Sequence, residues 1–226
     1  MDAKERAAAA AVDLLDGTII GLGSGSTAEC FIRALGEALR SGTVHGIRGV
    51  GTSRRSEELA REQGIPLMTL GEAKQIDVDV DGADEIDPQL NLIKGLGGAL
   101  LREKVVAQNS KRMIVIADAG KRVDVLGSRA PLPVEVVQFG FETQEDFLKW
   151  HGCEPTLRRG SDGKPFVTDN GNFIYDCRFP RIDQADALER ALKRRAGIVE
   201  TGLFLDIASA AVIADGNDVT ILTSPR

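Results

Sequence analysis

The densest group of side chains able to transfer protons is an acidic run between residues 77 and 87. It holds six carboxylates in eleven positions, namely Asp77, Asp79, Asp81, Asp84, Glu85 and Asp87. Strand alternation places Asp77, Asp79 and Asp81 on one face. Asp81 and Asp84 then fall at the carboxyl end of the strand, where open α/β sheets bind ligands. Carboxylates held together raise the pKa of one of them, which suits proton transfer, although a solvated acidic turn would show the same pattern.

The same run begins like a calcium-binding EF-hand loop, because residues 77–82 read D-x-D-x-D-G. Two later positions argue against calcium. Position 8 is Asp84 where an apolar residue is expected, and position 12 is Pro88 where a bidentate glutamate is needed. We therefore expect no metal in this run.

A glycine-rich turn at residues 23–27 follows a predicted strand and precedes a predicted helix. Its free N–H groups and hydroxyls, together with the positive helix end, suit a phosphate, and a capped glycine turn is an equally good interpretation. No lysine follows the second glycine, so the turn is not a Walker A loop. Gly23, Gly25 and Ala28 fit part of a dinucleotide fingerprint, but the second strand ends without the acid that binds ribose. NAD is therefore disfavoured, while Arg54 and Arg55 leave a phosphorylated nucleotide open.

A second glycine-rich turn, residues 94–98, brings a cation, Lys94, close to flexible backbone. Glu103 follows in a predicted helix between Arg102 and Lys104. Taken alone, Glu103 has the pattern of an exposed helical acid, and Lys121 that of a surface lysine.

Elements that alternate in type must position these groups. Residues 4–15 predict a helix, because helix-forming residues continue without Gly or Pro until Gly17. Strands and helices are then expected in alternation at 18–22, 28–40, 47–51, 53–63, 76–80, 100–108 and 113–117. This order is typical of an α/β fold with a Rossmann-like, mostly parallel sheet covered by helices on both faces.

After Pro131 and Pro133 the pattern changes. Strands are expected at 134–138, 166–168 and 173–177, and helices at 142–150 and 183–192. The β-α-β-β-α order predicts a ferredoxin-like α+β domain. Strands near 210–213 and 218–222 are expected to return to the first sheet. The predicted organisation is a Rossmann-like catalytic domain, residues 1–130 plus 204–226, with an inserted α+β domain, residues 131–203.

Charge and composition exclude several classes of binding partner. The 28 Lys and Arg against 34 Asp and Glu give a net charge of −6, which disfavours a nucleic-acid binder. The three cysteines show no metal-ligand spacing, so we expect a reduced, cytoplasmic protein. No apolar run approaches the roughly 20 residues of a membrane span, and neither a signal peptide nor a membrane partner is expected.

Seven blocks of this sequence, in order and in register, resemble type A ribose-5-phosphate isomerase. They are GLGSGSTA (21–28), DVDGADEID (79–87), KGLGGALLREK (94–104), IADAGKRVDVLG (116–127), PLPVEV (131–136), VTDNGNFIYD (167–176) and GLF (202–204). Any one block is weak, but the seven together are specific. The resemblance implies the interconversion of D-ribose 5-phosphate and D-ribulose 5-phosphate in the non-oxidative pentose phosphate pathway. It also implies two domains, no metal or cofactor, and a homodimer or homotetramer.

The resemblance further assigns roles to residues. It makes Glu103 the base that moves a proton between C2 and C1. Asp81 and Asp84 would handle hydroxyl protons, and Lys94 would offset negative charge on the enediolate oxygen. The residues it places against the substrate are Ser24, Gly25, Ser26, Thr27, Asp81, Gly82, Ala83, Asp84, Lys94, Gly95, Leu96, Gly97 and Lys121.

Some features leave questions open. The family usually has a third glycine where this chain has Leu96, so Leu96 would have to bind through its main chain. The roles of Lys4 and Arg6 are also open. Two other function classes compete: a non-catalytic sugar-phosphate sensor, which measured turnover would exclude, and an acyl or CoA transferase, which failure to bind a CoA analogue would exclude.

Overall fold

The computed structural model describes residues 1–224 and divides into two compact units. The first unit comprises Met1–Ala83, Arg102–Lys121 and the described chain from Asp206 onward. The second comprises Asp84–Leu101 and Arg122–Leu205. Each unit has a hydrophobic core of its own.

The first unit is built on a six-stranded sheet in the order β13-β12-β6-β3-β1-β2. Its strands are β1 (Ile19–Leu22), β2 (Arg48–Gly51), β3 (Ile76–Gly82), β6 (Ser110–Asp118), β12 (Ala210–Asp215) and β13 (Asp218–Thr223). The pairings from β2 through β12 are parallel, and β13 joins β12 antiparallel. The mostly parallel sheet predicted from the sequence is confirmed, including the return of the last two strands.

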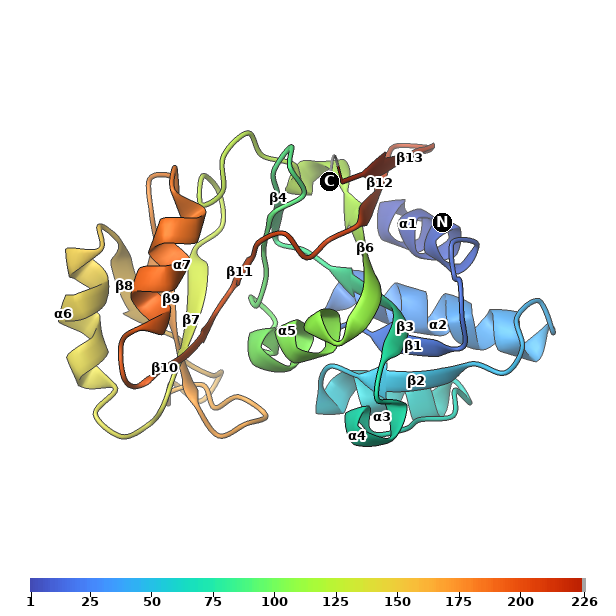
Figure 1. The fold of residues 1–226 in the computed structure, drawn as a ribbon, viewed down its shortest axis with the longest axis horizontal. Coiled ribbons are helices and arrows are strands. Elements are labelled where there is room, and N and C mark those ends of the chain that lie inside the picture. Colours follow the sequence, from blue (N-terminus) through green and yellow to red (C-terminus); the bar gives the residue numbers. More distant parts are fainter. Residues whose placement is uncertain (225–226) are drawn as a thin grey trace. The chain divides into compact units, whose positions relative to one another are not determined.

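Helices cover both faces of this sheet. They are α1 (Ala3–Val12), α2 (Ser26–Arg40), α3 (Arg54–Glu62), α4 (Leu70–Ala73), α5 (Leu100–Gln108) and the short 3₁₀ turn η1 (Ala119–Lys121). The helices α1 and α2 lie side by side, and their core includes Val78 and Val80 of β3 (Figure 1). Val106 of α5 packs on the other face of the sheet, beside Gly21 and Asp79. Asp79 lies between the two valines on β3, so its side chain points to the face opposite to theirs.

The second unit contains a four-stranded antiparallel sheet in the order β10-β7-β9-β8. Its elements are β7 (Leu132–Val136), α6 (Glu142–Trp150), β8 (Glu154–Leu157), β9 (Phe173–Arg178), α7 (Ala185–Lys193) and β10 (Ile198–Thr201). Their β-α-β-β-α-β order is that of a ferredoxin-like unit, as predicted. A small sheet, β11-β5-β4, accompanies it, made of β4 (Glu85–Ile86), β5 (Leu92–Ile93) and β11 (Leu203–Phe204).

One predicted strand is wrong. Residues 166–168 do not pair with β9, because β8 occupies that position through the register Pro155 to Cys177. The hydroxyl of Thr168 instead donates to Glu135 Oε1 at 2.9 Å, and the N–H of Phe166 donates to the carbonyl of Arg158 at 2.9 Å. These bonds hold the segment as irregular chain, although its apolar and β-branched residues favour a strand.

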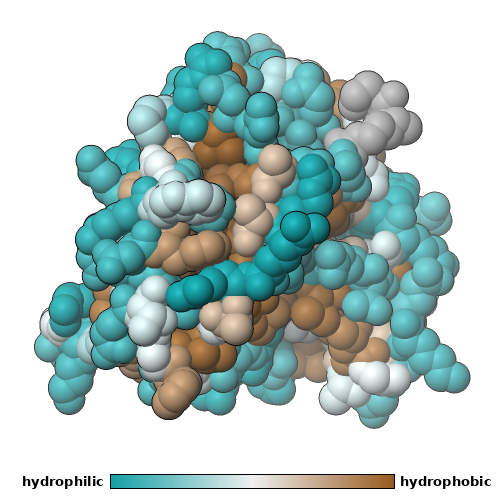
Figure 2. Space-filling model, turned by 60° about the vertical axis from the view of Figure 1, so that its left-hand side comes forward, coloured by the Kyte–Doolittle hydropathy of each residue, from teal (hydrophilic) through white to brown (hydrophobic). Residues whose placement is uncertain are grey.

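The surface is mainly hydrophilic on the face drawn in Figure 2, where hydrophobic residues gather in patches. Two aromatic side chains are largely exposed, Phe139 at 94% and Trp150 at 79%. Within residues 1–224, none of the helices combines the length and the apolar character that a membrane span requires.

Candidate active site

Asp81 fixes the loop between β1 and α2 at the carboxyl end of the parallel strands. Its Oδ1 accepts the N–H of Ser24 at 3.0 Å and the N–H of Gly82 at 2.7 Å. A Cβ on Gly23 would stand 2.2 Å from the same oxygen, so this position admits only glycine without rearrangement. The close approach of Gly23 therefore places a buried carboxylate directly beside residues 23–27.

That loop ends in an open helix terminus. Gly25 has φ +92° and is the N-cap of the 15-residue α2, so the N–H groups of the first turn receive no hydrogen bond from a capping side chain. Such a terminus favours an anion. The hydroxyl of Ser24 is engaged elsewhere, because it bonds to Thr52 Oγ1 at 2.8 Å and Ser53 Oγ at 2.7 Å. Ser24 thus ties the loop to the β2–α3 connection.

Lys4 is a residue that sequence reasoning could not place. Its Nζ donates to Ser26 Oγ at 2.9 Å, which brings a positive charge to the start of α2. A capping box between Asp2 and Glu5 fixes the first turn of α1, which carries Lys4. This box is the one local sequence signal for where Lys4 lies. Arg6 has another role, because its guanidinium donates to the carbonyls of Met1 and Gly216.

Glu103 is buried at 4% exposure, in contrast to the exposed acid that its position alone would predict. The path of α5 explains where it lies. The helix ends near the start of β3, where the N–H of Ile76 donates to the carbonyl of Asn109. The helix has nine residues and rises about 1.5 Å per residue, so it runs along the sheet. Because its last turn is near the start of β3, its first turn lies toward the carboxyl ends of the strands. Glu103 is one turn before Val106, and therefore shares the face that packs on β1 and β3.

Asp77, at the other end of β3, is structural. Its Oδ2 accepts the N–H groups of Thr18 at 2.9 Å and Ile19 at 3.0 Å, and Lys111 Nζ lies 2.8 Å from Oδ1. The bond from Lys111, followed by the backbone bond from Ile19, lowers the pKa of Asp77 to about 2. Of the acidic run, it is Asp81 and not Asp77 that lies at the carboxyl end of β3.

In the second unit, the GLF block positions Lys94. The Lys94 side chain is buried, and its Nζ lies 5.4 Å from the centroid of the Phe204 ring. Its N–H donates to the carbonyl of Gly202 at 2.9 Å. A Cβ on Gly202 would stand 2.2 Å from the Lys94 carbonyl oxygen. Gly202 and the ring of Phe204, which lies in β11 where that strand pairs with β5, therefore hold Lys94 in place.

The glycine loop, residues 94–98, uses the main chain of Leu96. The Leu96 N–H donates to Asp84 Oδ2 at 3.0 Å, while its side chain is 42% exposed. Positive φ angles occur at Gly95 and Gly98 but not at Leu96, so this position does not need a glycine. The departure from the family pattern is therefore compatible with the loop path.

The remaining predicted residues divide between the two units. In the first, Gly82 and Ala83 follow Asp81, and the half-buried Lys121 closes η1 just after the carboxyl end of β6. In the second, the exposed Gly97 lies in the glycine loop. Within residues 1–224, no group of three or more His, Cys, Asp or Glu side chains has an arrangement that could hold a metal ion.

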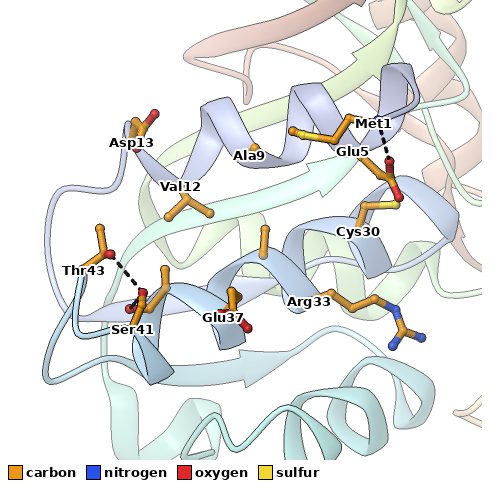
Figure 3. A pocket seen from close by; sticks show the side chains of 12 residues that line it. Met1, Glu5, Ala9, Val12, Asp13, Cys30, Arg33, Glu37, Ser41 and Thr43 are labelled. Atoms are coloured by element: carbon orange, nitrogen blue, oxygen red, sulfur yellow. Dashed lines mark hydrogen bonds and ion pairs between the residues drawn. The ribbon is translucent and has the colours of Figure 1, made fainter.

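A surface groove between α1 and α2 is separate from these residues. It has a volume of about 520 Å³, and its lining comes from the two helices and the turn after α2 (Figure 3). Val12 and Cys30 are among the residues drawn there, and burial raises the pKa of the Cys30 thiol. None of the predicted site residues belongs to its lining.

Buried carboxylates beside a helix terminus without a side-chain cap are typical of one class of protein, an α/β enzyme that moves protons on a phosphorylated substrate. Comparison with known proteins gives the family. Residues 48–218 match the model of ribose 5-phosphate isomerase A (phosphoriboisomerase A). The chain belongs to this family, and it is an aldose-ketose isomerase.

Individual relatives agree over the full length. Ribose-5-phosphate isomerase A of Roseiflexus castenholzii is 49% identical, over 98% of this chain and 95% of the relative. A solved D-ribose-5-phosphate isomerase in complex with phospho-erythronic acid is 41% identical, with a TM-score of 0.95 over 99% of this chain and 100% of that one. The structure from Methanocaldococcus jannaschii is 38% identical, with a TM-score of 0.92 over 98% of both chains.

Proposed function

We propose that this chain interconverts D-ribose 5-phosphate and D-ribulose 5-phosphate through an enediolate, with Glu103 as the base for both carbons. Family membership carries the activity and its place in the pentose phosphate pathway. The observation that supports the base is the burial of Glu103 in the first turn of α5, toward the carboxyl ends of the strands. A carboxylate sheltered from water is suited to accept a carbon-bound proton.

The proton balance assigns the other groups. Glu103 takes the C2 proton of the open-chain aldose and returns it to C1, while O1 gains a proton and the O2 hydroxyl loses one. We assign these oxygen protons, and those of ring opening, to Asp81 and Asp84. Lys94 stabilises the negative charge of the enediolate more than it stabilises the neutral sugar, which is the differential binding that lowers a barrier.

The phosphate is assigned to the start of α2. Ser26 and Thr27 supply N–H groups and hydroxyls at an uncapped terminus, and Lys4 adds a positive charge there. Ser24 contributes by holding the loop through its bonds to Thr52 and Ser53. Lys121 is the remaining proposed cationic contact. The other proposed contacts are made by the backbone of Gly25, Gly82, Ala83, Gly95, Leu96 and Gly97.

The ligand of a relative supports the enediolate. Phospho-erythronic acid, which is bound to the 41% identical isomerase, carries both a carboxylate and a phosphate. A carboxylate resembles the planar, negatively charged enediolate, so a site that binds the acid suits the intermediate.

The finer aspects of location and assembly are also proposals. We assign the protein to the cytoplasm, supported by free thiols at Cys30, Cys153 and Cys177. We also infer a homodimer or homotetramer, supported by the exposed aromatic rings of Phe139 and Trp150. Light scattering would test the assembly, and a mass equal to the 24.2 kDa of one chain would contradict it. The net charge of −6 gives no support for a nucleic-acid partner.

Isomerisation in D₂O tests the enediolate. A carboxylate base that holds the migrating proton exchanges part of it with solvent, so deuterium is expected at C1 of the ketose. Mass spectrometry and NMR of the product measure it. A ketose free of deuterium after many turnovers would indicate a hydride shift and contradict the enediolate. No conversion at all would favour the sugar-phosphate sensor instead.

A further inference from the structure

Arg158 binds the main-chain carbonyls of the glycine loop, whereas Asp84 accepts a main-chain N–H of the same loop. Arg158 follows β8 directly, and its side chain is 12% exposed. Its Nη1 donates to the carbonyls of both Gly95 and Leu96, each at 3.0 Å. We propose that Arg158 is a positioning residue for the isomerisation, acting through the backbone of residues 95 and 96 on Lys94 and Asp84. This inference rests on the proposed function of those two residues.

Asp176 orients the guanidinium of Arg158. Its Oδ2 accepts from Arg158 Nε at 2.9 Å, and its Oδ1 accepts from Nη2 at 2.5 Å. Asp176 lies on β9, opposite Thr156 of β8, so two paired strands hold the ion pair. A two-point Arg-carboxylate pair fixes the plane of the guanidinium, which leaves Nη1 directed at the loop.

Phe166 supports the other end of the loop. Gly98 has φ +84°, and a Cβ on it would stand 2.6 Å from two carbons of the Phe166 ring. The centre of the Arg158 guanidinium is 5.8 Å from the centroid of that ring. The N–H of Phe166 also donates to the Arg158 carbonyl, so one short segment contacts the loop at residues 95, 96 and 98.

The Leu96 residue connects Arg158 to the proposed catalytic groups. Its N–H donates to Asp84 while its carbonyl accepts from Arg158, so both bonds constrain one backbone segment. The Gly95 carbonyl, the second acceptor, is one residue after Lys94. Loss of the guanidinium would free two carbonyls and let this segment shift, and displacements near 1 Å in a site can cost about 100-fold in rate.

The first test replaces Arg158 by methionine, which keeps much of the apolar stem. We expect kcat to fall about 10- to 100-fold, with a KM change below about threefold and a circular dichroism spectrum like that of the wild type. Arg159→Met is the matched control, because the neighbouring Arg159 donates to the Gly163 carbonyl in an exposed turn. That variant is expected to stay within about twofold of the wild type.

Chemical rescue separates positioning from a general effect on folding. Arg158→Ala should regain activity several-fold when guanidinium ion is added at tens of millimolar, and Arg158→Lys should recover only part of kcat, because an ammonium lacks the planar fork. Arg158→Met with unchanged kcat in an active enzyme, or no rescue of a folded Arg158→Ala, would overturn the inference. A wild type without isomerase activity would instead overturn the proposed function on which it rests.

Discussion

Several glycines of this chain allow close contact with a charged residue. Gly21 faces Asp79, Gly23 faces Asp81, and Gly202 meets the carbonyl of Lys94. At each position a Cβ would stand within 2.4 Å of an atom of the charged residue, so the backbone approaches where other residues could not. At the scale of single residues, glycine therefore positions the candidate site as much as the charged side chains do.

Gly23→Ala tests this use of glycine. The new methyl group would collide with Asp81 Oδ1 and push the loop away from the carboxylate. We expect a loss of about 1 to 3 kcal/mol in the free energy of unfolding and at least a tenfold loss in kcat/KM. Urea unfolding and steady-state kinetics measure the two effects.

Gly71→Ala provides the control. Gly71 lies in α4, and an added Cβ would meet no atom within 4 Å, so this change should leave both quantities nearly unaltered. Equal behaviour of the two alanine variants would show that Gly23 is not needed for the contact with Asp81.

At the scale of elements, patterns that are local in sequence were the ones that could be predicted. Two helices, α5 and α6, have the bounds expected from their composition, because helix formers run between clear breaks. The two-residue strands β4, β5 and β11 are too short to show any period, and Pro155 obscures the alternation of β8.

The candidate site, like the fold, could be predicted from the sequence only in part. The resemblance supplied residues and roles, and their assignment to the reaction stays a prediction. The burial of Glu103 depends on how α5 packs on the sheet, which no local pattern of charges reveals. Likewise, Lys4 meets Ser26 across 22 positions of sequence. Contacts of this kind are set by tertiary structure and need the fold itself.

Asp77 joins the starts of β1 and β3 and gives a pH-dependent prediction. Because its pKa is lowered from 3.8 to about 2, the folded state favours the ionised carboxylate. The resulting stability is present in full above pH 3.8 and is lost as the pH falls toward 2. Asp77→Asn should therefore cost about 1 kcal/mol at pH 7, after allowance for solvent screening, and progressively less toward pH 2.

Urea unfolding of both proteins between pH 7 and pH 3 measures this difference. Asp146→Asn is a suitable control, because the Asp146 side chain is 98% exposed. A cost of Asp77→Asn that stays constant across this range would mean that the carboxylate charge does not stabilise the start of β1.

At the scale of the whole molecule, some of the blocks that carry the resemblance lie away from the carboxyl edge of the first sheet and make structural hydrogen bonds in the second unit. Glu135 of the PLPVEV block accepts from Thr168 and Asn172 of the VTDNGN block, both in the second unit. Glu85 accepts the N–H groups of Gly127, Arg129 and Ala130. Several blocks therefore serve the architecture. The expected insertion boundaries, residues 131–203, stay a prediction that limited proteolysis can test.

The most direct measurement follows the conversion of D-ribose 5-phosphate to the ketose in excess chelator, by the wild type and by Glu103→Gln. The glutamine keeps the shape of the side chain but cannot accept the proton, so we expect rapid, chelator-resistant turnover by the wild type. In the variant we expect a fall of about 100- to 10,000-fold in kcat with substrate affinity nearly unchanged. A variant that keeps most of its kcat would contradict Glu103 as the base, and a folded wild type without turnover would contradict the isomerase itself.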